Sequence, residues 1–275
     1  MDKFRIGTLL RFKDMTPDRL RFLRGIGMNC LQAAGLNGRF LTSDGKKEAE
    51  KWLAACAETQ LPVTSLFISL GELNLGAEEQ SGIGFSPVAF RGPRAALACR
   101  EIAWAAMRGI RRFICHTGPV PSEGRALFVQ TLVQLAEMCA DFGAELLMES
   151  GQETAEAMER LLAEIDRPNV GVNFDPANLV YYGNTAPAEF WAKLHDRVRG
   201  LHCKDAVRPL PGAEHGEETP LGAGEVGFAA LLETMLAAGF REELIVEREL
   251  PPGSELERDL AGAMTLLKQI TEAKK

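Results

Sequence analysis

Four ionisable side chains, each at the end of an apolar run, are the residues of this sequence best suited to chemistry. They are Glu149 in GAELLMES, Asp175 in NVGVNFDP, His202 in VRGLHCKD and Glu247 in EELIVERE. A buried strand is normally built from Val, Ile and Leu, so an ionisable group at its end needs a partner. Three carboxylates and one imidazole that meet at one end of a parallel sheet can bind a single divalent cation. The pattern indicates an enzyme.

The types of these four residues narrow the choice of cation. Three carboxylates and one imidazole, without a thiolate, do not resemble a structural zinc site. Mn²⁺ or Mg²⁺ fits best, with Mn²⁺ our first choice, and Co²⁺ and Zn²⁺ remain alternatives because ligand type alone does not separate them. Taken singly, Asp175 could form a turn before Pro176, His202 could be a hydrogen-bonded core histidine, and the glutamates could be surface charges. Their occurrence in register favours one metal site.

The four runs belong to an alternation of strand and helix patterns along the chain. We expect strands at 4–10, 28–35, 63–69, 111–118, 144–150, 170–176, 198–206 and 243–249. Helical patterns lie between them, near 16–26, 44–60, 93–109, 122–142, 153–165, 187–196, 226–238 and 255–273. Eight such units in 275 residues predict an α/β fold of the TIM (β/α)8 barrel type, as a single domain over residues 1–275. An open doubly wound sheet is the alternative, but its GxGxxG turn is absent from IGTLLRFKD.

Local signals support several of these boundaries. Thr16 stands before a proline and predicts the start of a helix, and Ser150 with Glu153 has the spacing of a capping box. Gly143 and Gly239 lie just past helical patterns, where a left-handed residue is favoured.

The spacing of the four ionisable residues also favours a barrel. The intervals are 26 residues from Glu149 to Asp175 and 27 from Asp175 to His202, and each is one strand–helix unit. The interval of 45 to Glu247 is lengthened by PLPGAEHGEETPLGAGEVG. All four therefore fall at the carboxyl ends of successive strands, the face where barrel enzymes place their chemistry. Two long loops, 71–87 and 207–225, are expected on the same face.

Strand alternation predicts which neighbours point the same way. If His202 points to the barrel axis, so does Lys204, whereas Leu201 and Cys203 face the helices. His116, at the end of the fourth strand, faces the same mouth, either as a substrate contact or as a hydrogen-bonded strand-end histidine.

The composition excludes several classes of protein. Hydrophobic residues make up 46% of the chain and charged residues 25%, as in globular proteins. We expect no membrane span, because no run of about 18 apolar residues occurs. We also expect no signal peptide, and therefore a cytoplasmic protein. A net charge of −7 weighs against nucleic-acid binding. The six cysteines are scattered, so we expect them to be reduced and mostly buried.

At the motifs around these residues the chain resembles the xylose isomerase-like TIM-barrel superfamily, which includes sugar isomerases, ketose 3-epimerases, inosose dehydratases and endonuclease IV. The series Glu, Asp, His, Glu at strands five to eight looks like that family's metal set. HCKDAVR (202–208) is similar to its H-x-K-D segment, and PLGAGEVGF (220–228) resembles its P-x-G-x-G stretch. Ketose 3-epimerases carry D-x-x-H at strand six, but this chain has Asn178, which cannot carry a proton. With only four histidines, the chain resembles endonuclease IV less.

The resemblance implies a metal-dependent sugar isomerase or epimerase that abstracts a proton beside a carbonyl through a metal-stabilised enediolate. Glu149 and Glu247 would act on opposite faces of the sugar, and together with Asp175 and His202 they would hold one cation. The side chains expected to contact a small-molecule sugar are Arg208, His116, Lys204 and Asn178. A dehydratase of an inosose or keto-sugar, an aldose–ketose or hydroxypyruvate isomerase, and a non-catalytic sugar-binding barrel remain alternatives. The resemblance also implies a homodimer or homotetramer.

Overall fold

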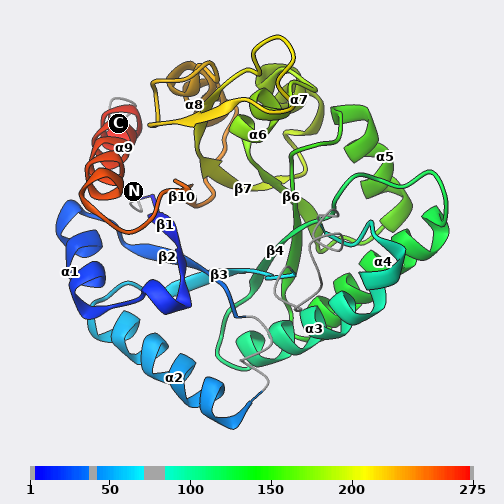
Figure 1. The fold of residues 1–275 in the computed structure, drawn as a ribbon, viewed down its shortest axis with the longest axis horizontal. Coiled ribbons are helices and arrows are strands. Elements are labelled where there is room, and N and C mark those ends of the chain that lie inside the picture. Colours follow the sequence, from blue (N-terminus) through cyan, green and yellow to red (C-terminus); the bar gives the residue numbers. More distant parts are fainter. Residues whose placement is uncertain (1–3, 37–41, 71–83, 273–275) are drawn as a thin grey trace.

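The computed structural model describes residues 4–36, 42–70 and 84–272, and parallel strands in this part of the chain close into a barrel (Figure 1). In chain order the barrel strands are β1 (Ile6–Arg11), β2 (Cys30–Ala34), β3 (Val63–Phe67), β4 (Arg112–His116), β5 (Glu145–Glu149), β6 (Val170–Phe174), β7 (Val198–Cys203) and β10 (Leu244–Val246). Gly7 of β1 pairs with Ile245 of β10 on one side and with Cys30 of β2 on the other, which closes the sheet. A closed sheet has no unpaired edge. The predicted TIM barrel is confirmed.

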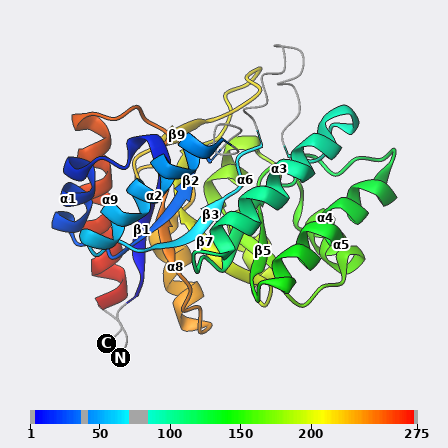
Figure 2. The ribbon, with the colours of Figure 1, turned by 90° about the horizontal axis from the view of Figure 1, so that it is seen from below.

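Helices surround the barrel as a ring (Figures 1 and 2). The ring consists of α1 (Pro17–Ile26), α2 (Ser43–Glu58), α3 (Val88–Ala106), α4 (Arg125–Asp141), α5 (Ala155–Ile165), α7 (Pro187–Leu194), α8 (Phe228–Ala237) and α9 (Ser254–Glu272). The ring closes where α9 meets α1: Arg19 Nη1 lies 3.4 Å from Glu257 Oε1, and Lys268 Nζ donates to the Ile26 carbonyl at 3.0 Å. Among the described helices, none has the length and apolar character that a membrane span requires.

Side chains alternate between two apolar layers. A small apolar cluster lies on the inward face of the strands and consists of Ala34, Phe67, Ile114 and Leu147, with Leu9 packed against it. The next residue along a strand, such as Met148 or Phe174, belongs to a much larger cluster shared with the helices. Leu201 and Cys203 lie in this outer cluster, as strand alternation predicted. Because each fully buried large apolar side chain stabilises the fold by about 1.5–3 kcal/mol, the outer layer provides most of the stability.

Helix ends follow most of the local signals. The Thr16 side chain accepts from the Arg19 N–H at 3.3 Å and caps α1. Gly143 and Gly239 have φ of 63° and 95°, the left-handed conformation expected of them. Helix α3 begins at Val88 rather than at residue 93, so that Pro93 lies inside it.

The predicted capping box of Ser150 and Glu153 is wrong. Thr154 caps α5 instead, because its side chain accepts from the Ala157 N–H at 3.3 Å. The Ser150 hydroxyl bonds to the backbone of Asp175, accepting from its N–H at 2.8 Å and donating to its carbonyl at 3.1 Å. Residues 150–153 therefore belong to the barrel rim and not to the helix.

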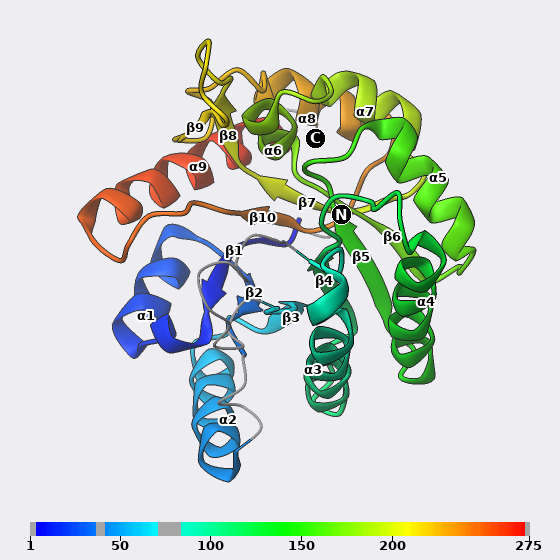
Figure 3. The same ribbon diagram turned by 45° about the vertical axis from the view of Figure 1, so that its right-hand side comes forward.

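Two short features at the barrel mouth were not predicted. Helix α6 (Pro176–Tyr182) follows β6 directly, and strands β8 (Asp205–Val207) and β9 (Glu217–Thr219) form an antiparallel hairpin that packs on α6 (Figure 3). The strand expected at 198–206 is therefore interrupted at Lys204. These elements are too short for hydrophobic periodicity to reveal them. Most of the other expected loop, residues 71–83, lies outside the described residues.

The close approach of β1 to β2 predicts a large effect of Gly7→Ala. A Cβ at this position would lie 2.2 Å from the Cys30 carbonyl oxygen, so the strand backbone must shift. We expect a loss of about 1–3 kcal/mol in the free energy of unfolding, measured by urea denaturation.

Gly262→Ala is the matched control. Gly262 lies exposed in the middle of α9, and among the described residues no atom outside the local helix backbone lies within 4 Å of an added Cβ. We expect this variant to gain up to about 1 kcal/mol, because Ala favours a helix more than Gly does. Equal effects of the two substitutions would contradict this account of the barrel packing.

Candidate metal centre

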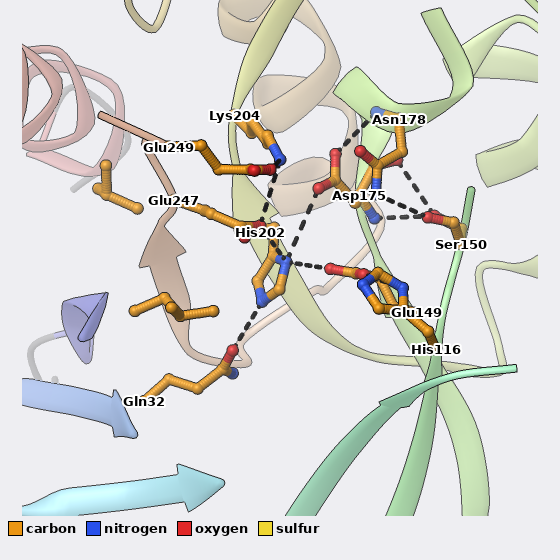
Figure 4. Close-up of polar contacts among 12 residues, drawn as sticks. Gln32, His116, Glu149, Ser150, Asp175, Asn178, His202, Lys204, Glu247 and Glu249 are labelled. Atoms are coloured by element: carbon orange, nitrogen blue, oxygen red, sulfur yellow. Dashed lines mark hydrogen bonds and ion pairs between the residues drawn. The ribbon is translucent and has the colours of Figure 1, made fainter. Parts of the chain in front are cut away.

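The side chains of Glu149, Asp175, His202 and Glu247 meet at the carboxyl end of the barrel (Figure 4). Glu149 is the last residue of β5, His202 lies near the end of β7, and Asp175 and Glu247 directly follow β6 and β10. One ligand atom from each residue lies within 4.8 Å of every other. The four side chains therefore meet as their spacing indicated, whereas metal binding by them stays a prediction.

The Nδ1 atom of His202 lies at the middle of this group. It is 2.6 Å from Glu149 Oε1, 2.9 Å from Glu247 Oε2 and 3.7 Å from Asp175 Oδ2. These atoms are buried, and within the described residues none of them has a hydrogen-bond partner of normal geometry. Buried carboxylates concentrated in this way require positive charge. Three carboxylate oxygens and an imidazole nitrogen are ligands for Mg²⁺ or Mn²⁺, so the residues fit a divalent cation.

The pKa values around Nδ1 follow from this concentration of charge. Burial disfavours the charged imidazole, but the carboxylates of Glu247 and Glu149 outweigh burial and raise the pKa of His202 well above its usual value. Burial likewise opposes ionisation of Glu149, yet the imidazoles of His116 and His202 lower the pKa of its carboxyl. Burial raises the pKa of Asp175. A bound cation competes with protons for these atoms.

Gln32 completes the environment of His202 on the other side of the ring. Its Oε1 lies 2.8 Å from His202 Nε2, and its amide nitrogen donates to Ser65 Oγ at 3.2 Å. Gln32 and Ser65 are buried inside the barrel. Gln32 was not among the residues predicted from the sequence, where its signal is weak: one polar residue within the apolar run CLQAA, with a side chain on the inward face.

Lys204 is brought to the centre by the interruption after β7. Its side chain is 7% exposed, and Nζ lies 2.5 Å from Glu249 Oε1, 3.6 Å from Glu218 Oε2 and 3.7 Å from Glu247 Oε2. Burial opposes its charge, but Glu247, Asp175 and Glu249 raise its pKa well above the usual value. Lys204 therefore remains a cation beside the carboxylates at neutral pH.

His116 and Asn178, two of the expected substrate contacts, also lie at the centre. His116 Nδ1 is 2.8 Å from Glu149 Oε2, and its side chain is half-exposed toward the mouth. The Asn178 N–H donates to Asp175 Oδ1 at 2.9 Å, and its side-chain amide donates to the Ser150 carbonyl at 3.3 Å. Asp175 thus caps α6 with one oxygen and faces His202 with the other.

Arg208 lies apart from this group. Its side chain is 66% exposed, and the guanidinium pairs with Glu225 at 3.7 Å. Within the described residues no contact joins it to the four central side chains, so its role as a substrate contact stays a prediction. Asp205, the last residue of the HCKD segment, accepts from the N–H groups of Gly222 and Val226 at 3.0 and 3.1 Å and thereby orders the loop after the hairpin.

Glu153 is a further buried acid beside the centre. It is 7% exposed, and in the described part of the chain its Oε1 has no hydrogen-bond partner. Burial raises the pKa of its carboxyl to about 7, while hydrogen bonding from the Glu153 backbone and the charge of nearby His116 partly offset that effect. The sequence predicts Glu153 at a helix cap instead, because a Glu three residues after a Ser fits that motif equally well.

Comparison with known proteins agrees with this architecture. The sequence profile of the family described as "Xylose isomerase-like TIM barrel" matches residues 20–270. A crystal structure of a xylose isomerase domain protein from Planctomyces limnophilus superposes with a TM-score of 0.85 at 28% identity and covers 98% of this chain and 97% of that chain. A xylose isomerase-like TIM barrel protein from Mycobacterium smegmatis, in complex with magnesium, has a TM-score of 0.74 at 17% identity and covers 98% of each chain, which shows a shared fold.

Curated relatives match over a shorter length. An inosose dehydratase of Clostridium botulinum (strain Alaska E43 / Type E3) is 27% identical over 143 residues, which cover 46% of this chain and 47% of that protein. The rhizopine catabolism protein MocC of Rhizobium meliloti is 29% identical over 160 residues, covering 52% of this chain and 49% of that protein. The matches therefore span about half the length of these relatives.

The geometry predicts that the protein purified without chelator retains about one divalent ion per chain, as measured by mass spectrometry. Glu149→Gln and Asp175→Asn should lose it, because each removes a charged ligand; Asn at 175 still caps α6. Glu145→Gln, at the opposite end of β5, is the control and should keep the ion. Metal content unchanged in both site variants would contradict the assignment.

The buried Glu153 carboxyl predicts a pH-dependent stability. Its pKa rises from 4.5 when exposed to about 7 in the folded protein, so the folded state binds the proton more tightly. The stabilisation that this difference in pKa gives to the folded state is complete below about pH 4.5 and is lost as the pH rises through about 7. Relative to Glu153→Gln, the wild type should lose about 3 kcal/mol in the free energy of unfolding across this window. Urea denaturation at a series of pH values measures this difference. If the free energy of unfolding changed with pH equally in the two proteins, the prediction would be refuted.

Proposed function

Because the chain belongs to the xylose isomerase-like TIM-barrel family, we propose that it is an enzyme that removes a proton from the carbon beside the carbonyl of a keto-sugar or keto-polyol. The observation that carries this proposal is the placement of Glu149 and Glu247 at the ends of two strands with His202 between them, at 2.6 and 2.9 Å from its Nδ1. Two carboxylates that face one position can take a proton from a bound substrate or return one to it. A bound divalent cation would supply Lewis acidity at the carbonyl and a neighbouring hydroxyl.

The charges around the two glutamates suit this role. Burial opposes their ionisation, but Lys204 and His202 lower the pKa of Glu247, as His116 and His202 lower that of Glu149, so at neutral pH both are ionised, the form that can take a proton from carbon. Glu247 is the more open of the two, with 14% of its side chain exposed against 1% for Glu149. The Lys204 ammonium beside Glu247 would donate to a substrate oxygen that gains negative charge after proton removal.

We propose dehydration as the reaction that follows. The electron pair left by the proton forms a carbon–carbon double bond, the bond to the hydroxyl at the next carbon breaks, and that hydroxyl leaves with a proton as water. Glu153 supports this outcome, because a carboxyl whose pKa is raised to about 7 is about half protonated near neutral pH and can supply the proton. The inosose dehydratase among the curated relatives favours the same outcome, with an inosose or a similar keto-polyol as substrate.

Epimerisation or isomerisation, the first choice from the sequence, is the second candidate. It shares the first proton removal and differs in the return of a proton to carbon or oxygen. The observation in its favour is the second carboxylate, since one glutamate can remove the proton and the other can return it to the opposite face. Asn178 in place of a proton-carrying histidine weighs against a ketose 3-epimerase.

Product analysis tests the proposal. The protein with Mn²⁺ is incubated in deuterated water with a panel of inososes, ketoses and keto-acids, and the products are identified by NMR and mass spectrometry. A dehydrated product supports the dehydratase, and a stereoisomer or aldose that carries solvent deuterium supports the second candidate. Tight binding of a sugar without deuterium incorporation or product would refute both in favour of a non-catalytic sugar-binding barrel.

We expect replacement of either carboxylate to lower turnover. Glu149→Gln and Glu247→Gln should each lower kcat by roughly 10²–10⁴-fold with the fold intact, because an amide cannot accept a proton from carbon. Glu243→Gln, at the opposite end of the last barrel strand, is the matched control and should retain turnover. More than about a tenth of wild-type activity in either site variant would exclude that residue as an essential base.

A further inference from the structure

We infer that Gln32 is a positioning residue that makes His202 a metal ligand, by accepting the proton of Nε2 and so keeping the lone pair of Nδ1 directed at the carboxylates. The inference rests on the divalent cation of the proposed function, but it concerns affinity for the ion and not the reaction. The contact that carries it is the 2.8 Å distance between His202 Nε2 and Gln32 Oε1, buried at the end of the barrel core.

The two ring nitrogens of His202 face opposite environments. Nδ1 faces the oxygens of Glu149 and Glu247, and Nε2 faces Gln32 (Figure 4). A neutral imidazole has one N–H and one lone pair, and a metal binds the lone pair. A cation among the carboxylates therefore requires the proton to be on Nε2, and a buried Nε2–H requires an acceptor. Gln32 Oε1 is that acceptor.

A glutamine amide could present either its oxygen or its nitrogen, and in this structure the oxygen faces His202 while the nitrogen faces Ser65. Gln32 and Ser65 are paired across β2 and β3, and the amide nitrogen of Gln32 donates to Ser65 Oγ at 3.2 Å. The amide oxygen is therefore free to accept from a protonated Nε2 of His202, while the hydroxyl of Ser65 satisfies the amide nitrogen. Neither side chain is more than 1% exposed, so bulk water does not compete for the two bonds.

Phe67 holds the plane of the imidazole. Its ring stacks on that of His202 with the centroids 6.1 Å apart and the planes inclined by 24°. Phe67 stands on β3 two residues after Ser65, on the same inward face. The ring is therefore held by stacking on one face and by a hydrogen bond at Nε2, while Nδ1 is left to the cation.

The experiment compares the affinity of the full chain for Mn²⁺ among four proteins, measured by electron paramagnetic resonance of the free ion. Gln32→Met removes the acceptor at similar volume and should weaken affinity by about 10–100-fold. Gln32→Glu keeps an acceptor oxygen and should bind Mn²⁺ at least as tightly as the wild type. Thr8→Val is the matched control: it removes a buried hydroxyl that donates to the Val246 carbonyl at 2.8 Å, and it should leave affinity unchanged.

The outcomes separate this inference from the proposed function. If the wild type binds Mn²⁺ and Gln32→Met binds it equally well, or if Thr8→Val loses as much affinity, the positioning role is refuted and the metal site stands. If the wild type does not bind Mn²⁺, both are refuted.

A spectroscopic readout decides the case in which Gln32→Met does not fold. In Mg²⁺-loaded wild type with isotope-labelled histidine, NMR should show one slowly exchanging ring proton of His202, and it should be attached to Nε2. The hydrogen bond to Gln32 should also shift this proton downfield, whereas a purely structural Gln32 would leave it without that shift and without slow exchange. A proton on Nδ1 in the loaded protein would overturn the inference.

Discussion

Three carboxylates face one buried imidazole nitrogen, and this concentration of negative charge requires positively charged groups around the site. Glu149, Asp175 and Glu247 face His202 Nδ1 at distances of 2.6 to 3.7 Å. Carboxylates so close and so buried repel one another unless positive charge is present. Lys204 and His116 provide part of that charge from the mouth of the barrel, and a divalent cation would provide the remainder.

The barrel separates this unfavourable cluster from the parts that stabilise the fold. The large apolar layer between strands and helices carries the stability, and the few side chains inside the barrel leave room for polar groups at its carboxyl end. Gln32 and Ser65 occupy inward positions that apolar residues would otherwise fill. Their hydrogen bonds recover part of the free energy that burial of polar groups costs, and they orient the ring of His202.

The unpredicted elements at the mouth complete the site. Helix α6 begins at the residue after Asp175 and is capped by it, so one carboxylate serves both helix and cluster. The hairpin of β8 and β9 supplies Glu218, which lies 3.6 Å from Lys204 Nζ and accepts from Arg248 at 2.6 Å. The proposed proton removal therefore depends on side chains from β5 and β7, from the segments after β6, β7 and β10, and from this hairpin.

The sequence alone determined the barrel, the outward and inward faces of its strands, and the four residues of the cluster. It did so because period-2 patterns and the regular spacing of Glu149, Asp175 and His202 are local properties of a parallel strand–helix repeat. Only the tertiary structure decided the contacts of Gln32, the burial of Glu153 and the exposure of Arg208. Gln32 lies 170 residues from His202 in the chain, so no local pattern relates the two. Glu153 fits a capping motif as well as a buried acid, and its pKa depends on the packing around it, which sequence spacing does not encode.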